Sequence, residues 1–289
     1  MSGSGALGPL GVFDSGLGGL TVVHALLEAL PEERIVYLGD TARVPYGTRS
    51  AGTVVRYARS CARVLTDHGV KALVVACNTV SAVALDVLRA ELDMPVVGVI
   101  EPGAIEAVRA AEAQAKKSGG PPPRVGVLGT LGTVNSGAYD RAVAQLSTRL
   151  EVVSQAAPLL VPLVEEGWLE GQVPELAVER YVAPLIEKGA HVIVLGCTHY
   201  PLLRPIIQRV AERLAGHPVD VVDSAVATAR AIAGMLDQGA IPRAAPNAAD
   251  ARLKLFVTDQ PMGFQRRADL FLGEHTPEVE QIDLPLLPG

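Results

Sequence analysis

The stretch "GVFDSGLGGLTVV", residues 11–23, contains a short apolar run, a turn rich in glycine and hydroxyl groups, and then the apolar start of a helix. Much later in the chain, "GVLGTLGTVNSGAY", residues 126–139, repeats this order of features. The two stretches begin at Gly11 and Gly126, 115 residues apart. Two strand–turn–helix units at this interval predict two similar α/β units in tandem.

Two of the three cysteines repeat at a similar interval. Cys77 ends the apolar run of "ALVVACNT", residues 72–79, and Cys197, 120 residues later, ends that of "VIVLGCTHY", residues 192–200. Ligands of parallel sheets bind outside the carboxyl ends of the strands. We therefore expect each unit to contribute one turn and one cysteine to a common active site.

Strand-like and helix-like segments alternate along the chain. Eight continuous apolar runs have the length of strands that are covered on both faces of a sheet: residues 9–14, 34–40, 71–77, 94–100, 124–130, 150–156, 191–197 and 218–224. Between them, residues 50–67 have apolar side chains on one helical face, with Ser50 as the predicted N-cap and Gly69 as the predicted stop. This alternation predicts the α/β class, with mostly parallel central sheets.

Breaks in the pattern predict the domain boundaries. The chain is expected to leave the first domain at "IEPGA", from residue 100, and to return at "VVDSA", from residue 221. The first α/β domain then comprises residues 1–101 and 222–289, and the second comprises residues 102–221. We expect two pseudo-symmetric doubly wound domains, with the active site in the cleft between them.

Composition restricts the classes of function. The 289 residues are 49% hydrophobic, but every apolar stretch is interrupted well short of the roughly 20 residues that cross a bilayer, which predicts a soluble protein. Residues 1–10 have no basic region or long apolar core, so we interpret them as a disordered leader and not as a secretory signal. Three cysteines without a CxxC pair suit a reducing compartment, and we expect a cytoplasmic location. A net charge of -6 argues against direct nucleic-acid or membrane binding and favours a small-molecule partner.

The cysteines divide into one structural residue and one candidate pair. Cys61 lies on the apolar face of a predicted helix, where a cysteine acts as a small hydrophobic residue. Cys77 and Cys197 each lie where a strand ends and the next segment begins, a place where helix N-terminal amides lower the pKa of a thiol. A zinc site is a weaker interpretation, because His199 has no convincing set of further ligands and the spacings match no structural zinc pattern. We predict no metal.

At this point the chain resembles the glutamate racemases, within the cofactor-independent aspartate/glutamate racemase family. The resemblance extends from Gly11 to the tail that ends at Gly273, and its motifs occur together and in order. They are "GVFDSGLGGLTV", "GDTARVPYG", "ACNT", "GVIEPG", "VPLVEEG", "GCTHYPLL" and "VDSA". One departure is Ala157, at a position where the family often has a cysteine that is not one of the catalytic pair.

The resemblance implies interconversion of L- and D-glutamate without a cofactor, which supplies D-glutamate for peptidoglycan and cell-wall biogenesis. Inversion at Cα removes a proton from one face and delivers another to the opposite face, so a two-base enzyme needs one thiolate and one thiol. The ordinary cysteine pKa of about 8.5 can be shifted in either direction by neighbouring groups. We expect glutamate as the small-molecule partner and a homodimer as the assembly.

The resemblance also implies roles for particular residues. Cys77 and Cys197 would be the two bases, with Asp14 assisting Cys77, His199 assisting Cys197, and Glu165 near the proton transfer on the histidine side. The residues implied to bind the carboxylates and ammonium group of the substrate are Asp14, Ser15, Pro45, Tyr46, Gly47, Asn78, Thr79, Thr130, Thr133 and Thr198.

Each of these residues also has a structural interpretation. Asp14 and Ser15 are common helix caps, an isolated His199 is more often a satisfied loop histidine, and paired glutamates such as Glu165 and Glu166 usually lie on a solvated helix face. The ordered set of motifs, and no single member, favours the catalytic interpretation.

Other function classes fit the sequence less well. A dinucleotide-binding enzyme would need the third glycine of GxGxxG and an acidic ribose partner, which the "DSGLGG" turn lacks. A pyridoxal-phosphate racemase would need a Schiff-base lysine in its site, but Lys71 begins its strand. A non-catalytic amino-acid-binding protein would not need paired thiols. An aspartate racemase is the alternative within the superfamily, and His199 favours glutamate by resemblance.

Overall fold

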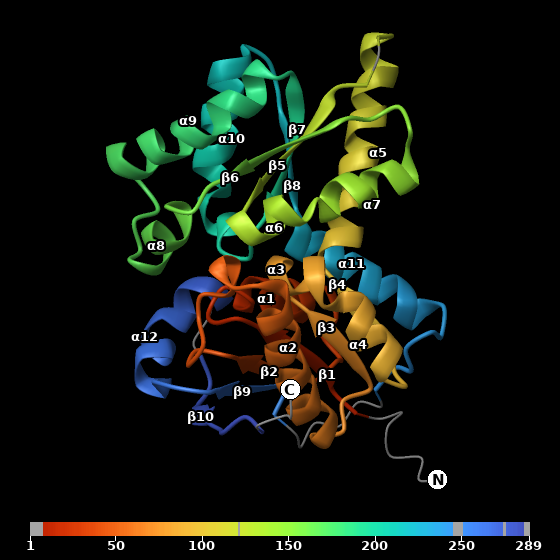
Figure 1. Ribbon diagram of the computed structural model, residues 1–289, viewed down its shortest axis with the longest axis vertical. Coiled ribbons are helices and arrows are strands. Elements are labelled where there is room, and N and C mark those ends of the chain that lie inside the picture. The colour runs from red at the N-terminus through yellow and green to blue at the C-terminus, as the bar shows by residue number, and fades with distance from the viewer. Residues whose placement is uncertain (1–7, 121, 245–250, 274–275, 286–289) are drawn as a thin grey trace. The chain divides into compact units, whose positions relative to one another are not determined.

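The computed structural model describes residues 8–120, 122–244, 251–273 and 276–285. The chain forms two compact units, Met1–Val99 with Thr228–Gly289 and, between them in the sequence, Ile100–Ala227 (Figure 1). The return to the first unit falls inside a continuous helix, α11 (Ser224–Asp237).

The first unit is built on a parallel sheet in the order β10-β9-β2-β1-β3-β4. Its strands are β1 (Leu10–Asp14), β2 (Ile35–Gly39), β3 (Ala72–Val75), β4 (Val96–Gly98), β9 (Leu253–Val257) and β10 (Val279–Gln281). The accompanying helices are α1 (Leu20–Ala29), α2 (Ala51–Asp67), α3 (Asn78–Val83), α4 (Leu85–Glu91) and α12 (Pro261–Leu272), with a 3₁₀ turn η2 at Tyr46–Thr48. Both faces of the sheet are buried, as the continuous apolar strands predict.

The second unit is built on a parallel sheet in the order β6-β5-β7-β8. Its strands are β5 (Arg124–Gly129), β6 (Val152–Ala156), β7 (Ala190–Gly196) and β8 (Asp220–Asp223). Its helices are α5 (Ile100–Ser118), α6 (Leu131–Ser136), α7 (Ala138–Leu146), α8 (Leu160–Glu165), α9 (Gln172–Glu187) and α10 (Arg204–Ala215), with a 3₁₀ turn η3 at Tyr200–Leu203. Figure 1 shows α5 and α7 on one face of this sheet and α9 and α10 on the other, which is a doubly wound arrangement.

The two sheets share one connectivity. In β2-β1-β3-β4 and in β6-β5-β7-β8, the second strand of the unit lies outside the first, and the third and fourth follow on the other side. The glycine-rich turn of residues 11–23 follows β1, and its counterpart in residues 126–139 follows β5. The two cysteines, Cys77 and Cys197, follow β3 and β7. The predicted α/β fold with tandem similar units is thus confirmed, and all eight predicted strands are present.

Helix α2 shows how the apolar face directs packing. Ser50 is its N-cap and accepts a hydrogen bond from the backbone N–H of Thr53, as predicted, and Gly69 follows the helix with a positive φ of 70°. Cys61 is fully buried in the core cluster between α2 and the sheet, together with Phe13. The structural interpretation of Cys61 is therefore confirmed.

Two parts of the sequence pattern differ from the structure. The predicted leader at residues 1–10 is too long, because Leu10 belongs to β1 and its backbone N–H donates to Arg34 O at 2.8 Å; residues 1–7 lie outside the described part of the chain. Strands β9 and β10 were missed. β9 is "LKLFV", where Lys254 interrupts the apolar run, and β10 has only three residues.

Lys71, which precedes β3, forms a buried ion pair. Its Nζ lies 2.6 Å from Glu33 Oε2, and Glu33 Oε1 accepts a hydrogen bond from the backbone N–H of Ala244 at 3.1 Å. The Glu33 side chain thus joins the segment before β3 to the loop at Ala244. Because the ammonium is already paired, Lys71 does not have the accessible amine that a Schiff base requires.

In the described ranges of the chain, no helix is both long and apolar enough to cross a membrane.

Candidate active site

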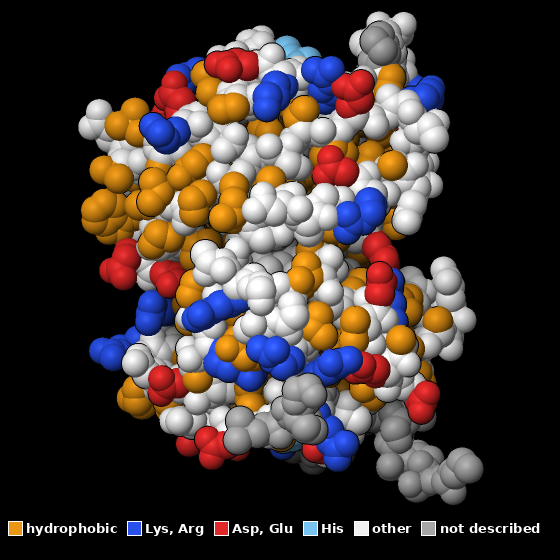
Figure 2. Space-filling model, viewed as in Figure 1, with side chains coloured by type: hydrophobic (Ala, Val, Ile, Leu, Met, Phe, Trp, Pro, Cys, Tyr) orange, Lys and Arg blue, Asp and Glu red, His pale blue; other side chains and the backbone are white. Residues whose placement is uncertain are grey.

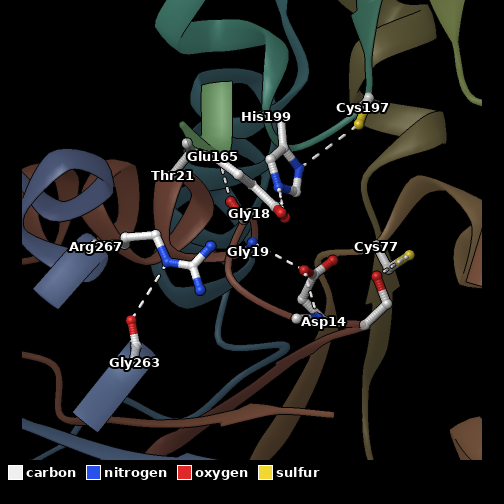
Figure 3. Close-up of polar contacts among 12 residues, drawn as sticks. Asp14, Gly18, Gly19, Thr21, Cys77, Glu165, Cys197, His199, Gly263 and Arg267 are labelled. Atoms are coloured by element: carbon white, nitrogen blue, oxygen red, sulfur yellow. Dashed lines mark hydrogen bonds and ion pairs between the residues drawn. The ribbon is translucent and has the colours of Figure 1, made fainter. Parts of the chain in front are cut away.

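The turn after β1 is organised by Asp14, the last residue of the strand. Its buried carboxylate accepts hydrogen bonds at Oδ2 from the backbone N–H groups of Gly16 and Gly19, both at 3.1 Å (Figure 3). The hydroxyl of Tyr37 donates to Gly16 O at 2.7 Å and supports the turn from β2. A Cβ atom at Gly19 would lie 2.4 Å from Asp14 Cβ, so this close approach requires glycine.

Cys77 lies at the equivalent end of the neighbouring strand, as the N-cap residue of α3. Its thiol points to Ser15, with Sγ and Oγ 3.7 Å apart, and Ala76 N donates to Phe13 O at 2.9 Å, which joins the two strand ends. In the sheet, β2 lies on one side of β1 and β3 on the other, so the chain changes direction across the sheet at β1. Asp14 and Cys77 therefore occupy the topological switch point. Such points are the usual ligand sites of doubly wound sheets.

The loop before α2 is held by Asp40, a residue to which the sequence pattern assigned no role. Its fully buried carboxylate accepts hydrogen bonds from Tyr46 Oη, from Arg43 Nε at 2.6 Å and, at the other oxygen, from Thr258 Oγ1 at 3.0 Å. Burial, together with the negative charges around it, raises the pKa of Tyr46 far above its ordinary value. The Tyr46 hydroxyl is therefore engaged inside the protein.

In the second unit, three predicted residues form a chain of contacts. Cys197 follows β7, and its Sγ lies 3.9 Å from His199 Nδ1. The other ring nitrogen, Nε2, lies 3.0 Å from Glu165 Oε1 at the end of α8 (Figure 3). Cys197 and His199 are buried, whereas the Glu165 side chain is partly exposed. The structure thus brings together a thiol, an imidazole and a carboxylate from three separate motif positions.

The environment of His199 favours its protonated form. Burial alone lowers the pKa, but the contacts with Cys197 and Glu165 outweigh it and raise the pKa of His199 to about 10. An imidazolium beside Sγ stabilises a thiolate and provides a proton within reach of it. The contacts therefore suit a thiol that exchanges a proton with a substrate.

The remaining half of this site is a pair of threonines at the end of β5. Thr130 is the N-cap of α6, and its Oγ1 accepts from Thr133 N at 3.2 Å and lies 3.0 Å from Thr133 Oγ1. Gly129 pairs with Gly196 in the sheet, so Thr130 and Cys197 follow adjacent positions of neighbouring strands. Tyr200 braces this edge, because its hydroxyl bonds to Ala157 O at 2.8 Å and Gly129 O at 3.3 Å.

The predicted residues therefore form two sets, one in each unit. Within the first unit, Asp14, Ser15 and Cys77 meet, and Asn78 and Thr79 open the helix after the thiol. The loop residues Pro45 and Gly47 flank Tyr46 beside α3. Within the second unit, Thr198 separates Cys197 from His199, and the threonine pair adjoins them along the sheet edge. In the part of the chain that the structure describes, no three His, Cys, Asp or Glu side chains are grouped to hold a metal ion.

Sequence reasoning missed Asp40, Tyr37 and Tyr200. The signal for Asp40 is its place directly after a buried strand, as with Asp14, inside the motif "GDTARVPYG". The two tyrosines carry no local signal, because their hydroxyls bond to backbone groups far away in the sequence.

Comparison with known proteins agrees with this geometry. The chain matches the profile of the Asp/Glu/Hydantoin racemase family over residues 11–232. It is 47% identical to the glutamate racemase of Geobacter metallireducens, over 95% of this chain and 96% of that protein. The strand order, with a thiol after the third strand of each unit, is that of an α/β protein built from two similar units. The chain belongs to the Asp/Glu/Hydantoin racemase family.

Solved structures agree in fold. The glutamate racemase of Francisella tularensis, crystallised with D-glutamate, superposes with a TM-score of 0.84 at 32% identity and covers 96% of this chain and 98% of its own. The glutamate racemase of Thermus thermophilus, crystallised with β-chloro-D-alanine, gives a TM-score of 0.80 at 40% identity, with 96% and 98% covered.

Removal of the Glu165 carboxylate is expected to lower the pKa of His199. In Glu165→Gln, the pKa should fall by roughly 1–3 units, because an adjacent opposite charge is lost. The neighbouring substitution Glu166→Gln is the matched control, because that side chain is exposed and its carboxylate is not the one that contacts His199. Titration of the His199 ring by NMR measures both, and an equal pKa in both variants would contradict the assigned contact.

The contact between Glu165 and His199 also makes the free energy of unfolding depend on pH. A pKa raised in the folded state contributes stability that is fully present below the unfolded value of about 6.5 and is lost as pH rises toward 10. Between about pH 6.5 and 10, the free energy of unfolding should therefore fall less in Glu165→Gln than in the wild type.

Proposed function

We propose that this protein interconverts L- and D-glutamate by proton transfer at Cα between two cysteines. The observation that supports this most is the equivalent placement of the thiols. Cys77 and Cys197 each follow the third strand of a unit, and each contacts a different polar group, Ser15 in one case and His199 in the other. Similarity to glutamate racemases over nearly the whole chain supports glutamate as the substrate, in preference to aspartate.

The proposed reaction starts with one cysteine as thiolate and the other as thiol. The thiolate removes the Cα proton from one face, and the thiol delivers its proton to the opposite face; the reverse reaction exchanges the two roles. His199, held by Glu165, stabilises the thiolate form of Cys197 and exchanges a proton with it. Asp14 is proposed to serve Cys77, next to Ser15, at the switch point of the first sheet.

Substrate binding is proposed to use neutral donors together with the helix starts. Hydroxyl, amide and turn N–H groups would bind the carboxylates and ammonium group of glutamate. The residues are Ser15, Pro45, Tyr46 through its backbone, Gly47, Asn78, Thr79, Thr130, Thr133 and Thr198. Asp14 would also contact the ammonium group. Backbone N–H groups at such turns stabilise negative charge without a cluster of arginines.

The wider proposal follows from this reaction. Each of the two units would act as one of two pseudo-symmetric domains, contributing one thiol. The D-glutamate formed would serve peptidoglycan synthesis, the enzyme would work in the cytoplasm as a homodimer, and thiol chemistry would replace a cofactor.

An optical assay tests the proposal directly. Purified protein is incubated with L-glutamate or with L-aspartate, without added pyridoxal phosphate or metal, and the circular dichroism signal is followed. We expect the signal of glutamate to decay to zero, unaffected by EDTA, and that of aspartate to persist. Decay with aspartate alone, an aldimine absorbance band, or EDTA inactivation that is reversed by zinc would contradict the proposal.

A further inference from the structure

The loop between β2 and α2, residues 40–50, is attached to the first unit by an arginine. Figure 2 shows Lys and Arg side chains spread over the surface of this unit, but the Arg43 side chain is only 24% exposed. Its Nε donates to the Asp40 carboxylate at 2.6 Å, and the centre of its guanidinium lies 4.1 Å from the centroid of the Tyr57 ring on α2. Arg43 thus links the end of β2 to a helix.

The two contacts of Arg43 use properties that only arginine combines. A planar guanidinium can donate to a carboxylate along its edge while its face rests on an aromatic ring. A lysine ammonium is a compact point charge, which can keep the ion pair but offers no flat face to the ring. Asp40 is fully buried at the strand end and Tyr57 belongs to α2, so the guanidinium fixes the loop against two rigid elements.

A third neighbour of the guanidinium adds little. Arg43 Nη2 lies 4.0 Å from Cys61 Sγ, which is a long contact to a weak acceptor. Burial raises the pKa of Cys61 well above its ordinary value, so the group stays a neutral thiol and forms no ion pair with Arg43. The attachment of the loop therefore depends on Asp40 and Tyr57.

The residues that follow Arg43 in the loop are placed by the same part of the unit. The ring of Tyr46 is buried and packs on the ring of Tyr57, with the two centroids 5.3 Å apart. A Cβ atom at Gly16 would lie 3.4 Å from Val44 Cγ2, so the loop also contacts the turn after β1. The loop therefore lies between this turn and α2.

We propose that Arg43 is a positioning residue, which holds residues 45–47 in the geometry that binds glutamate, with the Tyr57 ring as its platform. The inference rests on the proposed function, in which these three loop residues contact the substrate. Arg43 itself does not bind glutamate in this arrangement, because its guanidinium is engaged by the carboxylate and the ring. A displaced loop weakens the binding of substrate and transition state alike, which raises KM more than it lowers kcat.

The variant Arg43→Lys separates the shape of the side chain from its charge. It keeps a cation beside Asp40 but loses the face that rests on the ring. We expect KM for L- and D-glutamate to rise roughly 10-fold, with kcat within about 3-fold of the wild type. Arg49→Gln is the matched control, because Arg49 belongs to the same loop and has an exposed side chain. It removes a positive charge, and its KM should stay close to that of the wild type.

Tyr57 provides a second matched pair of variants. Tyr57→Phe keeps the ring under Arg43 and should retain the KM of the wild type, whereas Tyr57→Leu removes the ring and should raise KM about as much as Arg43→Lys. In the double variant of Arg43→Lys with Tyr57→Leu, the two increases should not multiply, because both changes remove the same contact. All rates are measured well below the melting temperature of each variant, so that KM refers to folded protein.

NMR tests the contact without substrate. The Tyr57 ring should shift the Arg43 Nε–H signal to lower frequency, and this shift should disappear in Tyr57→Leu. The backbone amide signals of Tyr46 and Gly47 should move in Arg43→Lys and stay in place in Arg49→Gln.

Several results would overturn the role of Arg43. These are an unchanged KM in Arg43→Lys, an equal rise of KM in Arg49→Gln, and increases that multiply in the double variant. A loss of kcat with an unchanged KM would also contradict it. If the wild type did not racemise glutamate, the proposed function would fail, and the amide signals would still decide whether Arg43 holds the loop.

Discussion

Replacement of Cys77 or of Cys197 by serine is expected to reduce glutamate racemisation by roughly 10²–10⁴-fold, the range that a positioned acid–base group contributes. A serine hydroxyl retains the shape of the thiol but is a far weaker acid and base near neutral pH. Each variant should lose activity in both directions, because inversion needs both faces of Cα. The loss of circular dichroism of L- and of D-glutamate measures this.

The two variants should differ in a half reaction. From 3-chloroglutamate, a single base can remove the Cα proton while chloride leaves from Cβ, and the resulting enamine hydrolyses to 2-oxoglutarate and ammonia. In the proposed reaction, Cys197 would remove the proton of the L form and Cys77 that of the D form. Cys77→Ser should therefore release 2-oxoglutarate only from the L enantiomer, and Cys197→Ser only from the D enantiomer.

The third cysteine provides the control. Cys61 is fully buried in the core cluster of the first unit, so Cys61→Ala should lose stability through a small cavity and keep its racemase activity. Processing of both enantiomers by both serine variants, or racemisation near the wild-type rate in either, would show that the two thiols do not divide the reaction in this way.

The fold was accessible from the sequence because its strands are continuous apolar runs. "GVFD" and "GVLG" each lie in the first strand of a unit, and helices cover both faces of these strands, so a continuous apolar run of strand length is what the fold requires. β9 was not accessible in this way. It lies at the outer part of its sheet, where Lys254 tolerates solvent, and its pairing with β2 joins residues more than 200 positions apart.

The site was accessible to the extent that its residues follow strands. Asp14, Cys77 and Cys197 each end an apolar run, and His199 is two residues from its cysteine. Asp40 has the same signal, but its partners Tyr46 and Thr258 are brought together only by the tertiary fold. The contact between Glu165 and His199 is of this second kind, since 34 residues separate them. Spacing suggests which residues act, whereas packing decides which residues touch.

Replacement of His199 by asparagine is expected to slow racemisation roughly 10²-fold, because Cys197 loses the neighbouring group that is proposed to exchange a proton with it. The loss must be equal in kcat/KM for L- and D-glutamate. Enantiomers have equal free energies in water, so their equilibrium constant is 1 and every variant has the same kcat/KM in both directions. Rates alone therefore cannot show which thiol has been impaired.

A deuterium at Cα of the substrate makes that distinction. In His199→Asn, the step at Cys197 limits both directions. With L-glutamate that step breaks the labelled bond and should show a full primary isotope effect on kcat/KM. With D-glutamate, Cys77 breaks the labelled bond in a faster step, and Cys197 then delivers a proton from solvent, so the isotope effect should be small. Asp14→Asn impairs the other thiol and should reverse the order, with the larger effect for D-glutamate. Equal isotope effects for the two enantiomers in both variants would mean that Asp14 and His199 do not serve separate cysteines.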